Sequence, residues 1–155
     1  MTQSTKNYRD INATPEMLYK AFTDPVALET WQVPGDMKAI VHQFDLRVGG
    51  GYEMSLFYPD SDNTPAGKTA GKEDRYKARF IELIPNQKIV EAIIFNTSNP
   101  DFAGEMRMEI TLEPVETGTR VTFLFTNIPV GINPADNEAG TISSLEKLAK
   151  YVENN

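Results

Sequence analysis

The spacing of apolar residues changes twice along the chain, from helical to alternating and back to helical. After an extended start that ends near Ile11, Thr14-Pro15 and Asp24-Pro25 each resemble a helix cap followed by a first helical residue. Apolar residues then recur at helical spacing, which predicts two short helices in tandem. The apolar faces of these helices comprise Met17, Leu18, Ala21, Phe22, Leu28 and Trp31.

Alternation of apolar and polar residues begins near Met37 and predicts a series of β-strands. In the first of these strands, Ile40, His42, Phe44 and Leu46 share one predicted face. The series is predicted to form an antiparallel meander with one solvated and one covered face. The further strands are predicted at 52–58, 74–84, 88–95, 105–113 and 120–127, separated by turn-rich spacers.

The C-terminal part of the chain returns to helical spacing after the cap-like pair Asn133-Pro134. The order of elements predicts the α+β class, with a single domain over residues 1–155 and a curved antiparallel sheet wrapped around one helix. Residues 59–73 form the one long predicted loop and are a candidate flap. The apolar positions of the long helix are Ile142, Leu145, Leu148, Ala149 and Val152.

Three consecutive glycines, Gly49, Gly50 and Gly51, raise the question of a phosphate-binding loop. Such a loop lies between a strand and a helix whose N-terminal N–H groups face the anion. Predicted strands flank the glycines on both sides, so we interpret them as a tight hairpin connection. The 59–73 loop contains shorter matches to nucleotide and calcium motifs, but each lacks a required glycine or glutamate.

Composition narrows the expected partners and compartment. The 155 residues carry a net charge of -7, which disfavours binding to nucleic acid or to an anionic membrane surface. There is no cysteine, and no metal-ligand or cofactor motif is complete, so we expect neither a metal nor a cofactor. The N-terminus lacks the apolar segment of a signal peptide, and no segment has the length of a membrane span, so we expect a cytoplasmic protein.

The single histidine, His42, limits the catalytic alternatives. No pair of histidines exists for a metal site, and no Gly-x-Ser-x-Gly elbow accompanies His42 for nucleophilic catalysis. On the alternation of its strand, His42 faces the same side as Phe44, where it would be a polar group in a cavity. Two interpretations stay open: a general acid or base inside that cavity, or a structural histidine with a hydrogen bond.

Large apolar side chains are numerous on the predicted sheet, and they face a helix that contains Gly140, Ser143 and Ser144. Small residues on that helix can leave a pocket, although the same side chains can also simply fill a core. We expect an internal cavity that binds a small hydrophobic molecule. Its predicted lining is Trp31, His42, Phe44, Tyr52, Met54, Tyr76, Phe80, Phe95, Met106, Met108, Phe123, Phe125, Thr141, Ile142 and Leu145.

Four parts of the chain together carry a family resemblance: "INATPEMLYKAFTDPVALETW", "FDLRVGGGYEM", the strand pair at 104–127 and "GTISSLEKLAKYV". They resemble the family of homologues of the heat-shock-protein-90 ATPase activator, in the START-like SRPBCC superfamily. The resemblance implies a helix-grip fold, in which a seven-stranded antiparallel sheet curls around the C-terminal helix and encloses a cavity for apolar ligands. It also implies a structural salt bridge between Asp45 and Arg47. Many relatives have Gly-Trp where this chain has Gly140-Thr141, which leaves more room or adds a hydroxyl.

Three functions remain as hypotheses. The first is a non-enzymatic binder of a small hydrophobic or aromatic molecule, with His42, Tyr52, Tyr76 and Thr141 as candidate polar anchors. The second, implied by the superfamily, is an enzyme of the cyclase, aromatase or hydrolase type that uses His42. The third is an interaction protein that regulates a chaperone partner, which requires an exposed apolar patch. A homodimer is also left open by the sequence.

Overall fold

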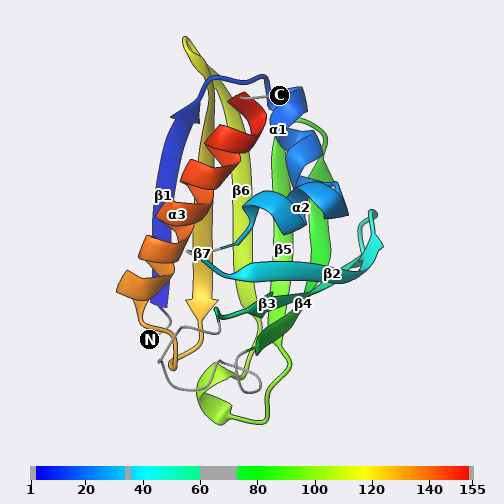
Figure 1. The fold of residues 1–155 in the computed structure, drawn as a ribbon, viewed down its shortest axis with the longest axis vertical. Helices are drawn as coiled ribbons and strands as arrows, with labels where there is room; N and C mark the ends of the chain where they lie inside the picture. The colour runs from blue at the N-terminus through cyan, green and yellow to red at the C-terminus, as the bar shows by residue number, and fades with distance from the viewer. Residues whose placement is uncertain (1–2, 34–35, 60–72, 154–155) are drawn as a thin grey trace.

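Seven antiparallel strands form one sheet in the order β1-β7-β6-β5-β4-β3-β2, and three helices lie along one side of it (Figure 1). The computed structural model describes residues 3–33, 36–59 and 73–153, so most of the predicted flap lies outside the described residues. The elements are β1 (Gln3–Ile11), α1 (Pro15–Phe22), α2 (Pro25–Trp31), β2 (Lys38–Asp45), β3 (Gly51–Phe57), β4 (Glu73–Ile84), β5 (Lys88–Phe95), the short 3-10 helix η1 (Pro100–Phe102), β6 (Met106–Val115), β7 (Gly118–Ile128) and α3 (Pro134–Glu153).

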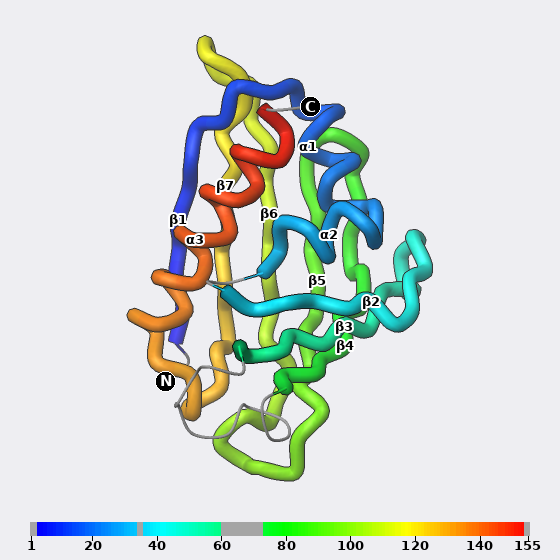
Figure 2. Tube along the Cα trace, in the orientation of Figure 1, coloured from blue at the N-terminus to red at the C-terminus, as the bar shows by residue number. Residues whose placement is uncertain are grey.

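The predicted α+β, helix-grip fold is therefore confirmed. The chain trace shows α3 running diagonally across the β1 and β7 side of the sheet, while α1 and α2 lie beside it (Figure 2). Within the described ranges, no helix combines the length and the apolar character that a membrane crossing requires.

Both short helices begin at the predicted cap residues. The Thr14 hydroxyl accepts a hydrogen bond from the Met17 backbone N–H at 3.2 Å, and the Asp24 carboxylate accepts one from Val26 at 2.9 Å. A proline follows each cap, where its missing N–H has no helical partner to lose. These local interactions explain why the positions of α1 and α2 were predictable from the sequence.

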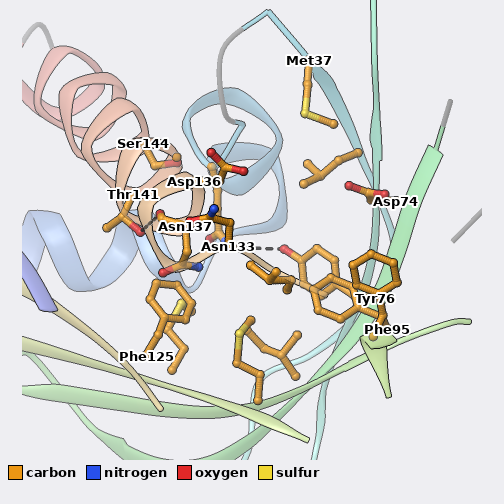
Figure 3. Close-up of a pocket in the computed structure, with 18 of the residues that line it drawn as sticks. Met37, Asp74, Tyr76, Phe95, Phe125, Asn133, Asp136, Asn137, Thr141 and Ser144 are labelled. Atoms are coloured by element: carbon orange, nitrogen blue, oxygen red, sulfur yellow. Dashed lines mark hydrogen bonds between the residues drawn. The ribbon is translucent and has the colours of Figure 1, made fainter. Parts of the chain in front are cut away.

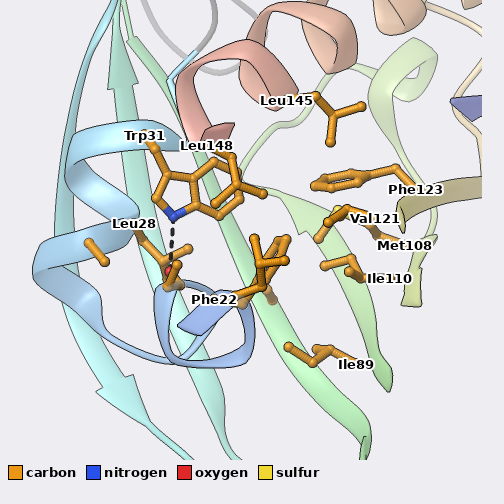
Figure 4. Packing of buried hydrophobic residues seen from close by; sticks show 14 of the residues in the cluster. Phe22, Leu28, Trp31, Ile89, Met108, Ile110, Val121, Phe123, Leu145 and Leu148 are labelled. Atoms are coloured by element: carbon orange, nitrogen blue, oxygen red, sulfur yellow. Dashed lines mark hydrogen bonds between the residues drawn. The ribbon is translucent and has the colours of Figure 1, made fainter. Parts of the chain in front are cut away.

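The fully packed part of the hydrophobic core lies around Trp31 (Figure 4). This side chain is 0% exposed, and its indole N–H donates to the backbone oxygen of Ala21 at 2.9 Å. The ring meets Phe22 edge to face, with 4.8 Å between ring centroids. Leu148 of α3 and Phe123 of β7 belong to the same buried cluster, which therefore joins all three helices to the sheet.

The glycine run connects β2 to β3 as a tight turn, as predicted. Gly49 has a φ of +89°, which side-chain-bearing residues rarely adopt. At Gly51, an added Cβ atom would lie 1.9 Å from the backbone oxygen of Ala78 on β4, so only glycine fits between the strands. The expected Asp45–Arg47 ion pair also forms beside this turn, at 2.8 Å, with both side chains largely exposed.

The predicted faces of the first alternating strand are wrong, because a β-bulge interrupts β2 at His42. Val41 pairs with Met54, but Gln43 pairs with the very next residue of β3, Glu53. The extra residue in β2 reverses the alternation. Consequently Phe44 packs against the core, whereas Ile40, His42 and Leu46 are exposed.

The predicted apolar stripe of α3 also needs one correction. Ile142 is 50% exposed, whereas the buried stripe includes Thr141, Ser144, Leu145 and Leu148. These positions follow the three- and four-residue spacing of one helix face, and Ile142 lies beyond its edge. The polar members Thr141 and Ser144 thus face the sheet near the middle of the helix.

Replacing Gly51 with alanine tests the close approach of β3 to β4. We expect Gly51→Ala to lower the free energy of unfolding by about 3 kcal/mol or more, because the new methyl group overlaps the Ala78 carbonyl. Gly49→Ala is the matched control: its added Cβ meets no atom within 4 Å, so only backbone strain of about 1 to 2 kcal/mol is expected. Urea unfolding measures both values, and equal losses would contradict the steric argument.

Candidate functional site

A cavity of about 480 Å³ lies between the N-terminal half of α3 and the covered face of the sheet (Figure 3). Side chains from β3 to β7 form its apolar wall, and α3 contributes small and polar residues from the opposite side. In Figure 3, Tyr76 and Phe95 lie across the cavity from Thr141 and Ser144. The apolar wall includes Leu56, Ile93, Phe95, Phe102, Met106, Met108, Phe123 and Phe125.

The cavity contains about half of the predicted lining residues. Tyr76, Phe95, Met106, Met108, Phe123, Phe125 and Thr141 all line it. The other predicted residues lie elsewhere: Trp31, Tyr52, Met54, Phe80 and Leu145 are buried in the core, Phe44 packs against that core, and His42 and Ile142 are exposed. The bulge in β2 explains the position of His42, and the helix stripe explains that of Ile142.

A buried polar network lies at the β-sheet side of the cavity. Gln32, the residue that ends α2, donates from Nε2 to the Tyr76 hydroxyl at 3.3 Å and to the Tyr52 hydroxyl at 3.5 Å. The Tyr52 hydroxyl donates in turn to the Glu91 carboxylate at 2.7 Å. Gln32 and Tyr76 line the cavity, whereas Tyr52 and Glu91 stand behind them. The network therefore connects the cavity surface to a buried acid.

The electrostatics of this network depend on burial. Glu91 is 2% exposed, and this desolvation raises its pKa to about 7, although the hydrogen bond from Tyr52 acts in the opposite direction. Burial likewise raises the pKa of Tyr52 and of Tyr76, and the nearby Glu91 charge raises both further. Both hydroxyls thus keep their protons at neutral pH and can act as hydrogen-bond donors.

A second polar group lies where α3 begins. The Thr5 hydroxyl of β1 donates to the Asn137 side-chain oxygen, and the Thr141 hydroxyl donates to the Asn137 backbone oxygen at 2.9 Å. The Thr5 bond joins the first turns of α3 to β1, whereas the Thr141 bond lies within the helix. On the opposite wall, the Tyr58 hydroxyl donates to the carboxylate of Asp74 at 2.7 Å. Among the described lining residues, Asp136 belongs to the first turn of α3, and Asp74 belongs to the opposite wall.

The exposed ring of His42 has no contact with the cavity. Its Nε2 atom lies 2.9 Å from the hydroxyl of Ser55, and this hydroxyl donates to the carboxylate of Glu73. Tyr52 and Met54 point to the covered face of β3, and Ser55 points to the opposite face. The contact between His42 and Ser55 therefore lies on the outer face of the sheet. Because the serine proton is directed to Glu73, His42 is not placed as a base for a serine nucleophile.

Metal binding has no obvious site in the part of the chain that the structure describes. No group of three or more histidine, aspartate or glutamate side chains lies close enough together there to hold an ion.

The sequence reasoning missed Gln32, Asp74, Asn137 and the buried Glu91. A signal for Glu91 was present, because it is the single charged residue among the apolar residues that follow Lys88 in β5, "KIVEAIIF". A charge in such a strand is rarely buried without a specific partner. Gln32 had no comparable signal, since a polar residue at a helix end is ordinary.

The buried acid predicts a specific pH dependence of stability. In the unfolded chain, Glu91 titrates near its ordinary pKa of 4.5, whereas the folded protein retains this proton up to about pH 7. The folded state binds more protons between these values, so the free energy of unfolding falls as pH rises through this window, by about 3 kcal/mol at most. Glu91→Gln should remove this fall and be more stable than the wild type at pH 8.

Urea unfolding at pH 5, 6, 7 and 8, followed by the fluorescence of Trp31, measures this dependence. Glu146→Gln on the exposed face of α3 is the matched control and should follow the wild type at every pH. A Glu91→Gln profile parallel to that of the wild type would show that Glu91 does not titrate in this range.

The comparisons with known proteins agree with the fold and the earlier resemblance. No curated protein matches the sequence. A crystal structure of a protein from Chromobacterium violaceum is 31% identical, with a TM-score of 0.84, and the match covers 97% of this chain and 98% of that one.

Two more distant structures share the fold. A solution structure from Arthrobacter aurescens is 19% identical with a TM-score of 0.80, covering 98% of this chain and 87% of that one. The AHSA1-like protein from Aeromonas hydrophila is 18% identical with a TM-score of 0.71, covering 98% and 93%. The family described as Activator of Hsp90 ATPase homolog 1-like protein matches residues 12–153. The chain belongs to this family.

Proposed function

We propose that the protein binds one small molecule with a mainly apolar body in the cavity between α3 and the sheet. The observation that carries this proposal is the cavity itself: about 480 Å³ of space bounded by aromatic and methionine side chains. Ligand pockets for small molecules typically measure roughly 300 to 1,000 Å³ and have mostly apolar walls with a few polar groups. Both the size and the lining match this description.

The distribution of side-chain volume on α3 supports the same proposal. Gly140, Thr141 and Ser144 line the cavity from the helix, whereas Leu145 and Leu148 of the same helix fill the core nearby. A packed interior would place large apolar residues along the whole buried stripe. Here the N-terminal half of the stripe has little volume, and the space remains between it and the sheet.

The wall opposite α3 can adapt to the shape of a ligand. Met106 and Met108 line the cavity from β6, and Phe123 and Phe125 line it from β7. Methionine side chains are flexible and polarizable, and aromatic rings provide flat contact surfaces. These residue types suit a ligand with an aromatic or alicyclic body better than a ligand with a polar body.

Binding rather than catalysis is the function that the polar groups support. His42 lies on the outer face of the sheet, and the buried acid Glu91 contacts the cavity only through the Tyr52 hydroxyl and Gln32. A general acid or base must approach the reacting atom within hydrogen-bond distance. Neither His42 nor Glu91 has that position. Of the two carboxylates that line the cavity, Asp74 already accepts a hydrogen bond from Tyr58, and Asp136 is exposed to solvent.

Filling the cavity from α3 tests the proposal. The neutral fluorescent probe N-phenyl-1-naphthylamine should bind the wild-type protein with one-to-one stoichiometry and increased emission. Ser144→Leu places an isobutyl group in the cavity and should weaken this binding at least tenfold. Ser143→Leu is the matched control, because Ser143 lies on the same helix and is not part of the cavity lining; it should leave the affinity within about twofold.

Native mass spectrometry of the protein from its own cells provides an independent readout. A retained small molecule at one equivalent, absent from Ser144→Leu, would support the proposal and identify the ligand. If the probe binds both serine variants and the wild type equally, the binding site is elsewhere and the proposal is wrong.

A further inference from the structure

The charges around the cavity restrict the kind of molecule that it can accept. The described residues that line it include Asp74 and Asp136 but no lysine, arginine or histidine. Glu91, which is 2% exposed, lies directly behind the wall. A ligand with a carboxylate would therefore meet like charges and find no basic partner among the described lining residues, at a cost that burial increases. Fatty acids and other organic anions are thus poorly suited to this cavity.

A cationic ligand is also disfavoured. Asp74 is 1% exposed and already accepts a hydrogen bond from Tyr58, and Asp136 is exposed to solvent. A buried ammonium group needs a close carboxylate that can replace its hydration. The apolar wall formed by Phe95, Phe125 and their neighbours provides no such group. An uncharged molecule remains.

Gln32 and Tyr76 provide the polar contact for such a molecule. The Tyr76 hydroxyl accepts a hydrogen bond from Gln32, and its own proton can be donated to an oxygen in the cavity. The Gln32 amide oxygen can accept a hydrogen bond from a ligand hydroxyl in return. Figure 3 shows Tyr76 at the sheet side of the cavity beside Phe95. The centroids of these two rings are 6.1 Å apart.

Tyr52 and Glu91 position these two side chains from behind. The carboxylate accepts the Tyr52 proton at 2.7 Å, which leaves the Tyr52 oxygen to accept from the Gln32 amide. This chain of bonds fixes the amide group of Gln32, and the same amide donates to Tyr76. A connected buried network of this kind specifies one arrangement of its members.

We propose that the cavity selects an uncharged molecule whose apolar body ends in one hydroxyl or carbonyl oxygen, and that Gln32 and Tyr76 bind this oxygen. The inference rests on the proposed binding function and specifies its ligand class. The body of the ligand lies between Phe123, Phe125 and Met108 on the sheet and Thr141 and Ser144 on α3. Tyr52 and Glu91 are positioning residues.

Four probes with the same biphenyl body test this selection: biphenyl, 4-phenylphenol, biphenyl-4-carboxylate and biphenyl-4-methylammonium. Affinities are measured by displacement of N-phenyl-1-naphthylamine at pH 7.5. In the wild type, 4-phenylphenol should bind about three- to tenfold more tightly than biphenyl, the gain typical of one buried hydrogen bond. Each charged probe should bind at least tenfold more weakly than 4-phenylphenol.

Tyr76→Phe should remove the preference for 4-phenylphenol, so that this probe and biphenyl bind the variant with similar affinity. Tyr58→Phe is the matched control, because it removes another hydroxyl of the same cavity whose proton is donated to Asp74; the preference should persist. Gln32→Met is the second test variant and should reduce the preference in the same direction. Circular dichroism verifies that each variant is folded, and if Tyr76→Phe does not fold, Gln32→Met decides the outcome.

The possible failures are distinguishable. If biphenyl and 4-phenylphenol bind the wild type equally, if a charged probe binds more tightly than 4-phenylphenol, or if the preference survives in both test variants, the inference is overturned while the cavity remains a binding site. If no probe displaces the dye, or if the dye itself does not bind, the proposed function fails and the inference fails with it.

Discussion

The packing of the C-terminal half of α3 against Trp31 and the sheet is the interaction on which the remaining structure depends. Trp31 is fully buried and fixed by its bond to Ala21, and Leu148 belongs to the same cluster. This contact sets the distance between helix and sheet along the whole length of α3. Because the middle of the helix presents the small side chains of Thr141 and Ser144 at that distance, the space beside them is not filled, and the cavity follows directly from the adjacent packing.

The buried acid Glu91 shows how the same fold accommodates a costly group. Its desolvation opposes folding near neutral pH, and the hydrogen bond from Tyr52 offsets only part of this penalty. In return, the acid orders the polar side chains at the cavity wall. It holds the Tyr52 hydroxyl, and through Gln32 this bond also positions the Tyr76 hydroxyl. Glu91 thus lowers the free energy of unfolding near neutral pH and also positions side chains of the candidate site.

Local interactions made much of the fold predictable. Thr14 and Asp24 cap helices through backbone groups only two or three residues away, and the alternation in β6 depends on neighbours along one strand. The hairpin at Gly49 follows from the backbone conformation of one residue. The β-bulge at His42 was not predictable in this way, because it reflects the pairing of β2 with β3 rather than any feature of β2 alone.

The sequence by itself determined the class of fold, the order of the elements and the apolar character of one sheet face, because each of these depends on periodicity and on contacts between near neighbours. Only the tertiary structure decided which of the apolar side chains fill the core and which surround a cavity. It also decided the partners of Glu91 and Tyr76, since the bonds join residues that are 39 and 44 positions apart. Such contacts depend on how α2, β3, β4 and β5 meet in space, and no local pattern encodes that meeting.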